Sequence, residues 1–183
     1  MSQIGVSDFK YAVLSKDDKE GVSYGEWNAI PGLVSVDIKS SGSVSTNYAD
    51  NGPFETASNL GDTTISIEQA ELPDKDRAVL LGHQLGANGE MIYSSDDVAP
   101  YVAIAMKGKN ADGTAKHVKL LKVKFSEPAD SFVTEKGSVD FKNFSVEGKA
   151  SCRLYDHQWK RTLDERNTGV TPEGIAAFTA SVE

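Results

Sequence analysis

Period-two alternation of apolar and polar residues is the feature that most constrains this fold. In the clearest stretch, Phe141 to Tyr155, one set of alternate positions is apolar or small and the other set is polar. Successive side chains of a β-strand point to opposite faces, so this stretch predicts a long strand with one buried side. Cys152 falls on the apolar side, where a thiol packs as a small hydrophobic group. Arg153 falls on the solvated side.

Several other segments share this alternation or are rich in strand-forming residues. They predict strands over 9–14, 32–38, 62–68, 101–107 and 116–125, with polar turns at 16–21 and 108–113. The segment 101–107 is largely uncharged on both sides, which favours a central strand. We therefore predict a mainly β fold, a β-sandwich of antiparallel sheets.

One short helix is expected to flank the sheets. Pro73 suits a first helical position, Asp74 and Asp76 complement the positive end of the helix dipole, and Gly82 suits a left-handed terminator. A helix this short needs tertiary packing to be stable. The residues of 171–181 suit either a second helix or a closing strand, and the sequence leaves this choice open.

The longest segment expected to be irregular covers 40–61. It is rich in serine, glycine and asparagine, and such long loops are usually functional or disordered. Tyr48 and Phe54 argue against disorder, because exposed rings in a polar loop need a cover. That cover is either this chain or a neighbouring copy. We expect residues 1–183 to form a single domain that carries this loop.

Length and composition exclude several classes of protein. A chain of 183 residues can bury a sizeable core, and its one cysteine excludes a disulfide within the chain. The longest nearly apolar stretch, Val98 to Met106, is far shorter than the roughly 20 residues of a membrane helix. The first eight residues lack the basic start and apolar run of a signal peptide. We expect synthesis in a cytoplasm.

The residues point to no catalytic, cofactor or metal site. His83, His117 and His157 lie in separate elements, and His83 is interpreted as a cap that complements the helix dipole. Asp96 and Asp97 follow two serines before a strand, a pattern typical of a turn that bonds its own backbone. We therefore expect a protein that is not an enzyme and that needs no cofactor.

Charge is distributed unevenly along the chain. Residues 1–100 hold 16 acidic and six basic residues, whereas residues 101–183 hold 11 and 13. A net charge of -8 and the lack of an arginine-rich tract argue against sequence-specific nucleic-acid binding. The asymmetry suits copies that associate head to tail.

Four short motifs resemble a known family, the major tail proteins, or tail tube proteins, of long-tailed bacteriophages, of the phi-thirteen type found in phages of Gram-positive hosts. Their order and spacing span most of residues 5 to 165. The motifs are Tyr48-Ala49-Asp50-Asn51-Gly52-Pro53, Leu80-Leu81-Gly82-His83, Asp96-Asp97-Val98-Ala99-Pro100-Tyr101-Val102-Ala103-Ile104 and Lys124-Phe125-Ser126-Glu127-Pro128.

The resemblance implies a tail-tube domain that assembles into homohexameric rings, which stack into a conduit for the genome. It also implies a place in the virion tail after assembly in the host cytoplasm, with tape measure protein, tail terminator and distal tail protein as partners. DNA would pass through the lumen without specific binding. The family's immunoglobulin-like C-terminal domain is not expected. Asn51 stands where the family pattern suggests an acid.

The loop is our hypothesis for part of the contact between subunits or rings, through Tyr48, Asp50, Asn51 and Phe54. A lumen that releases DNA should be acidic or neutral, because each phosphate neutralised by a basic residue adds affinity. The lysine-rich segment 116–124 should then face outward or toward a neighbour's acids.

Two other classes of protein remain open at this point. A carbohydrate-binding or adhesion β-sandwich would also be acidic and rich in strands, but Trp27 and Trp159 lie far apart in the sequence. A small cytoplasmic enzyme would need convergent polar groups that the sequence does not show.

Overall fold

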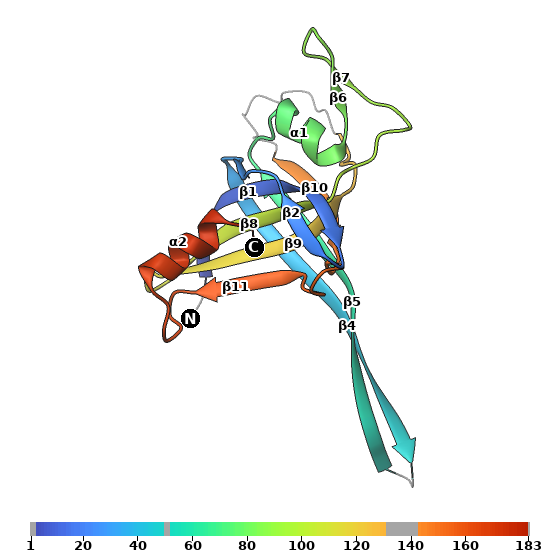
Figure 1. Cartoon of the computed structure of the whole chain (residues 1–183), viewed down its shortest axis with the longest axis vertical. Coiled ribbons are helices and arrows are strands. Elements are labelled where there is room, and N and C mark those ends of the chain that lie inside the picture. The colour runs from blue at the N-terminus through green and yellow to red at the C-terminus, as the bar shows by residue number, and fades with distance from the viewer. Residues whose placement is uncertain (1–2, 50–51, 131–142, 183) are drawn as a thin grey trace, which may run out of the picture.

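Antiparallel strands build the molecule, whose computed structural model describes residues 3–49, 52–130 and 143–182. Nine strands of these residues form one sheet, with the order β2-β1-β8-β9-β10-β5-β4, β3 beside β1 and β11 beside β9 (Figure 1). The strands of this sheet are β1 (Gln3–Asp18), β2 (Gly21–Tyr24), β3 (Asn28–Ala29), β4 (Leu33–Ala49), β5 (Gly52–Gln69), β8 (Val102–Asn110), β9 (Ala115–Phe125), β10 (Phe144–Ala150) and β11 (Lys160–Asp164). The prediction of a mainly β, antiparallel fold is confirmed.

The core lies on one face of this sheet. β1 and β4 are not hydrogen-bonded neighbours, yet they contact each other, so the sheet curls and encloses apolar side chains. β8 is buried along most of its length, as expected of a central strand. The buried members of this cluster are Phe9, Tyr11, Ile30, Ile65, Ile67, Leu80, Leu81, Val102, Ile104, Met106, Leu120, Val123, Phe125 and Val146.

Helix α1 (Asp74–Leu81) begins directly after Pro73, as the sequence predicts within one residue. Gly82 ends it with a left-handed backbone (φ 81°), and a Cβ there would lie 2.3 Å from the Val98 carbonyl oxygen. Glycine is therefore needed for both the conformation and the close approach. After α1 the chain forms the small hairpin β6 (Gln84–Leu85) and β7 (Met91–Ile92).

Helix α2 (Pro172–Ala180) resolves the choice that the sequence left open for 171–181. Thr171 caps it, because its hydroxyl oxygen accepts a hydrogen bond from the Gly174 N–H at 3.1 Å. Pro172 occupies the first turn, where its missing N–H costs nothing. The helix covers the face of β1, β8 and β9 opposite the main core.

The expected irregular loop over 40–61 is wrong, because β4 and β5 continue through it as a paired hairpin on both sides of 50–51. Abundant serine and asparagine are typical of loops. However, Val44, Thr46 and Tyr48 alternate with Ser43, Ser45 and Asn47, which is a strand pattern of polar composition.

The long strand predicted from Phe141 to Tyr155 is shorter in the structure, where β10 covers only Phe144–Ala150. Residues 141 and 142 lie outside the described residues. Beyond Ala150 the chain leaves the sheet, so the expected placement of Cys152 on a buried face is wrong and its side chain is exposed. Arg153, expected in solvent, is buried instead.

Candidate assembly surface

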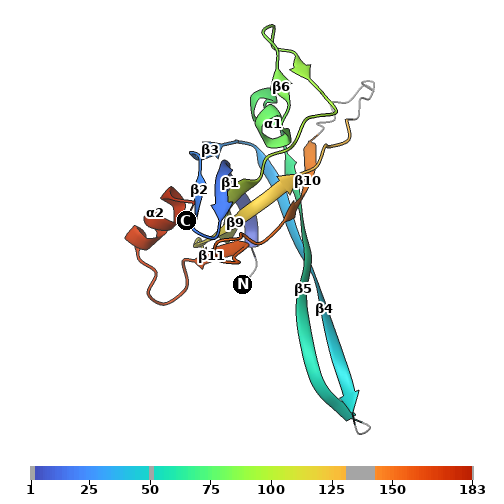
Figure 2. The ribbon, with the colours of Figure 1, turned by 45° about the vertical axis from the view of Figure 1, so that its right-hand side comes forward.

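The paired outer parts of β4 and β5 project from the body as an arm, which we define as Gly42–Ala49 with Gly52–Leu60 (Figures 1 and 2). Eight residue pairs connect its two strands, from Gly42 opposite Leu60 to Ala49 opposite Gly52. At about 3.3 Å per residue the arm extends about 25 Å. A hairpin of two strands is marginally stable alone in water.

Two of the predicted contact residues lie on the arm's strands. Tyr48 belongs to β4 and pairs with Pro53, next to Phe54 in β5. Asp50 and Asn51, the other two predicted contact residues, lie outside the described residues. The backbone therefore brings Tyr48 and Phe54 to the outer end of the arm.

The base of the arm is a break in strand register. Between Ser40 and Gly42 the pairing shifts, and a Cβ on Gly61 would lie 2.2 Å from the Ser41 carbonyl oxygen. The Ser41 hydroxyl donates to the Asp62 carbonyl oxygen at 2.8 Å. Such bulges bend a strand pair, and this one lies where the pair leaves the core.

The outer edge of β4 is open among the described residues, because β4 pairs there with β5 alone. Edge strands of this kind present unpaired backbone N–H and C=O groups to another chain. Val34 on this edge is 43% exposed, and Ile4 of the neighbouring β1 is 62% exposed. Backbone groups and apolar side chains are therefore both available at this edge.

The end of the molecule opposite the arm carries α1 and the β6–β7 hairpin (Figure 1). Large apolar side chains are exposed on the segment 84–101 that contains this hairpin. They are Leu85, Ile92, Tyr93, Val98 and Tyr101. The two ends of the molecule therefore differ in chemistry.

A cluster of charged side chains around His83 holds this second end of the molecule together. His83 Nδ1 lies 2.7 Å from an Asp97 carboxylate oxygen, and its Nε2 lies 2.8 Å from one of Glu127. Arg77 donates to Glu127 and to Asp130. The cluster joins three of the four motifs that carry the family resemblance. The ring of His83, which the sequence predicts as a helix cap, also bridges two carboxylates, and the backbone N–H of His83 donates to the Ala78 carbonyl oxygen at the end of α1.

The two carboxylates favour the protonated imidazole. The hydrogen bond with Asp97 raises the pKa of His83 most, Glu127 adds to this rise, and partial burial opposes it. The predicted turn at Asp97 is confirmed, because its carboxylate accepts from the Ser94 N–H at 2.9 Å. The cluster thereby attaches 84–101 and the chain after β9 to the end of α1.

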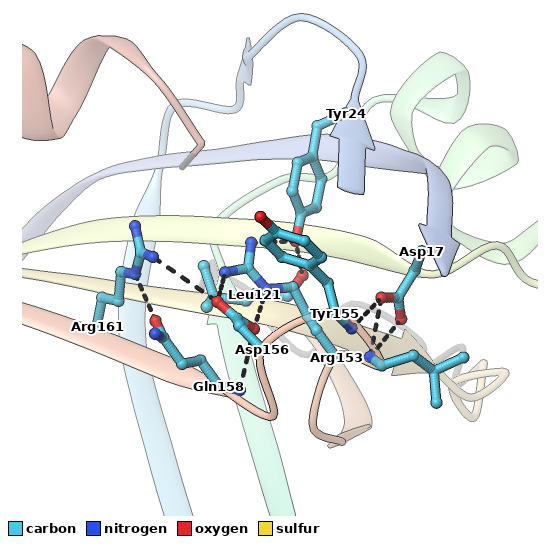
Figure 3. Close-up of polar contacts among 9 residues, drawn as sticks. Asp17, Tyr24, Leu121, Arg153, Tyr155, Asp156, Gln158 and Arg161 are labelled. Atoms are coloured by element: carbon cyan, nitrogen blue, oxygen red, sulfur yellow. Dashed lines mark hydrogen bonds and ion pairs between the residues drawn. The ribbon is translucent and has the colours of Figure 1, made fainter. Parts of the chain in front are cut away.

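A second polar network surrounds Arg153, whose side chain is almost fully buried (Figure 3). It forms a two-contact ion pair with Asp156, and its Nη1 donates to the Tyr24 hydroxyl oxygen at 3.2 Å. Tyr24 in turn donates to the Leu121 carbonyl oxygen at 2.9 Å. Arg153 is therefore fully compensated, and its bonds to Asp156 and Tyr24 raise its pKa against the effect of burial.

Asp17 attaches the segment after β10, which contains Arg153, to the end of β1 near its turn into β2. Its carboxylate accepts hydrogen bonds from the backbone N–H groups of Leu154 and Tyr155 (Figure 3). It also pairs with Lys122, whose Nζ lies 2.6 Å from a carboxylate oxygen of Asp17. Burial opposes ionisation of Asp17, but these bonds lower its pKa overall. The only sequence signal for this network is the spacing of Arg153 and Asp156.

The lysine-rich segment 116–124 is expected to face outward or toward a neighbour's acids, but two of its lysines contact their own chain. Lys119 is 1% exposed and lies under α2, while Lys122 pairs with Asp17 of the same chain. The outward orientation expected for 116–124 is therefore wrong at Lys119.

Within the described ranges, no helix is long and apolar enough to cross a membrane. The same ranges hold no group of three or more side chains arranged to bind a metal ion. Comparison of the sequence with protein-family models and with curated proteins found no match.

Proposed function

We propose that this chain is a structural protein of a bacteriophage tail, which assembles through its own copies into stacked hexameric rings that form the tail tube. The single observation that carries the proposal is the arm. It extends two strands beyond the large core of the described residues, to which the arm contributes no side chain. A second copy is the simplest support.

Ring closure would use the sheet edges. The open edge of β4 offers backbone groups that an edge strand of a neighbouring copy can satisfy, and closing a sheet into a barrel removes such edges. Because lateral edges are used within a ring, the two ends of the molecule are left for contacts between rings.

Stacking would join unlike ends. The arm lies at one end and the β6–β7 hairpin lies at the other (Figure 2). The segment 84–101, which contains this hairpin, carries the exposed apolar side chains. Contacts between unlike surfaces repeat without limit and produce a filament. Tyr48 and Phe54 on the arm are our candidates for anchors in this contact.

The wall of the tube would be the solvated face of β4, β5 and β10. It carries more acidic than basic side chains: Asp37, Asp62, Glu68 and Glu147 against Lys39 and Lys149. A wall of this kind gains little affinity from phosphates, so DNA could slide past it. Tape measure protein, tail terminator and distal tail protein are the further partners that the family resemblance suggests.

Electron microscopy with sedimentation velocity tests the proposal. Concentrated protein should form rings or tubes, and the combined variant Tyr48→Ala, Phe54→Ala should form rings without normal tubes. A matched control, Ser145→Ala on an exposed position of β10, should assemble like the unmodified protein. Normal tubes from the double variant would refute the arm contact. Monomers that bind sugars would instead support the adhesion module.

A further inference from the structure

Lys119 is the most deeply buried lysine described in this structure, at 1% exposure. It projects from β9 toward α2, where its Nζ donates to the Ser181 carbonyl oxygen at 2.7 Å and lies 4.1 Å from the centre of the Phe178 ring. No carboxylate lies within ion-pair distance of it among the described residues. Buried charges normally have a partner of opposite sign.

Within residues 3–49, 52–130 and 143–182, the groups around Lys119 do not supply that partner. The charged groups that act on it are Arg161 of β11 and Lys10 of β1, both positive. The carboxyl end of a helix carries about half a negative charge, and Lys10 shares it through a bond to the Thr179 carbonyl oxygen. Burial first, and these two cations second, lower the pKa of Lys119 to about 8.

A cavity of about 400 Å³ opens beside this amine, between α2 and the sheet. Apolar side chains from both sides line part of it, among them Ala105, Ile175 and Phe178. Its other charged groups are Asp8 and Lys10 of β1, Lys107 of β8, and the pair formed by His117 and Glu165, whose atoms lie 3.0 Å apart.

Backbone strain marks the same cavity. Asp8, on its rim, has a left-handed backbone with φ 57° at an irregularity in β1. Non-glycine residues in this region cost free energy and occur often at binding sites. Strain, a cavity and a buried cation with no carboxylate partner in the described part of the chain therefore coincide at one place.

We propose that this cavity binds a small organic carboxylate with an apolar tail. The carboxylate would accept hydrogen bonds from Lys119, and the tail would lie against Ala105, Ile175 and Phe178. Such a ligand supplies the missing negative charge and covers apolar surface at the same time. Binding would also attach α2 more firmly, since α2 has no buried residue of its own. This inference does not depend on the proposed function.

Octanoate is the probe, measured by titration calorimetry on the full chain. We expect saturable binding with a Kd below about 1 mM. Lys119→Met removes the charge at nearly constant volume and should weaken binding at least about tenfold, the loss of one charge-assisted hydrogen bond. The control Lys39→Met, at an exposed lysine on β4, should bind like the unmodified protein. Octanol, which lacks the charge, and inorganic phosphate, which lacks the apolar tail, should each bind at least tenfold more weakly than octanoate.

A second measurement uses the unmodified protein. In NMR titrations octanoate should raise the pKa of Lys119 above about 8, and octanoate affinity should fall as pH rises through that value. Equal binding by Lys119→Met, an unchanged Lys119 titration, or the absence of saturable octanoate binding would each overturn the proposal. Failure to form tubes has no bearing on any of these outcomes.

Discussion

β4 and β5 each have an inner part that packs against the core and an outer part that extends beyond it. In the inner part, Val36 faces Ile67 and Ile38 faces Ile65, and all four contribute to the core. In the outer part the same two strands form the arm, and the pairing continues without support from the core. The register break at Ser41 and Gly61 separates the two parts.

This difference separates the stability that a sheet gains from backbone hydrogen bonds from the stability that it gains from apolar burial. Backbone pairing exchanges bonds with water and gives a small net gain, whereas buried apolar area stabilises strands directly. The inner part is therefore stabilised by folding alone. The outer part extends far beyond what this chain can stabilise, and we take a second copy as its missing partner.

The largest expected effect comes from removing the arm. Replacing residues 43–59 by an Asn-Gly turn should abolish tubes and leave single rings, because the contact between rings is lost. The melting temperature of the monomer should stay within about 2 °C, since the arm adds nothing to the core. Sedimentation velocity and calorimetry measure the two quantities. A large drop in melting temperature would show that the arm belongs to the folding unit.

The next effect tests a buried charge of the body. Asp156→Asn should destabilise the monomer by about 3–5 kcal/mol, because it leaves Arg153 buried without its counter-charge. The control is Asp62→Asn, which breaks an exposed ion pair with Lys149 near the base of the arm. It should cost at most about 1 kcal/mol. Denaturant unfolding compares them, and equal costs would contradict this assignment.

Ile67→Ala tests the apolar contribution of the inner part. The side chain is 1% exposed, so its truncation should cost about 2–5 kcal/mol in denaturant unfolding. Assembly should persist at temperatures where the variant stays folded. A loss below about 1 kcal/mol would mean that the inner strands are not held by their core.

The smallest effect is a pH dependence at the end opposite the arm. The pKa of His83 is raised above its usual value of about 6.5, so its contribution to stability is complete below about pH 6.5 and is lost as pH rises through the folded-state pKa. His83→Gln should flatten this part of the pH–stability curve. The exposed control His157→Asn should retain it. Unfolding curves recorded between pH 5 and 9 measure this dependence. The same pH dependence of unfolding free energy in both variants would contradict the assignment.

Alternation predicted most of the sheet because buried strands follow it strictly. The strands predicted at 9–14, 32–38, 62–68, 101–107 and 116–125 all match observed strands, with 32–38 and 101–107 starting one residue too early, and the helix after Pro73 is present. The same rule failed at Cys152 and Arg153, where the chain leaves the sheet although the alternation continues. Periodicity does not predict where a strand stops pairing with the adjacent strand.

The candidate surface was less accessible to prediction from sequence. Tyr48 and Phe54 were identified as rings that need a cover, but the polar composition around them concealed the strands of the arm. The contacts of His83 with Asp97 and Glu127 join segments far apart in the chain. No local sequence pattern predicts that these segments meet. Lys119 was expected in solvent, because nothing in its own strand shows that α2 lies over it.

Hydrogen exchange of the arm's amides tests the central claim most directly. In dilute monomer, amides of 43–48 and 53–59 should exchange much faster than those of β8 and β9. When the protein is concentrated enough to assemble, the arm should become protected while β8 and β9 change little. Protection of the arm already in the monomer, or fast exchange in the assembled protein, would contradict the claim that another copy completes it.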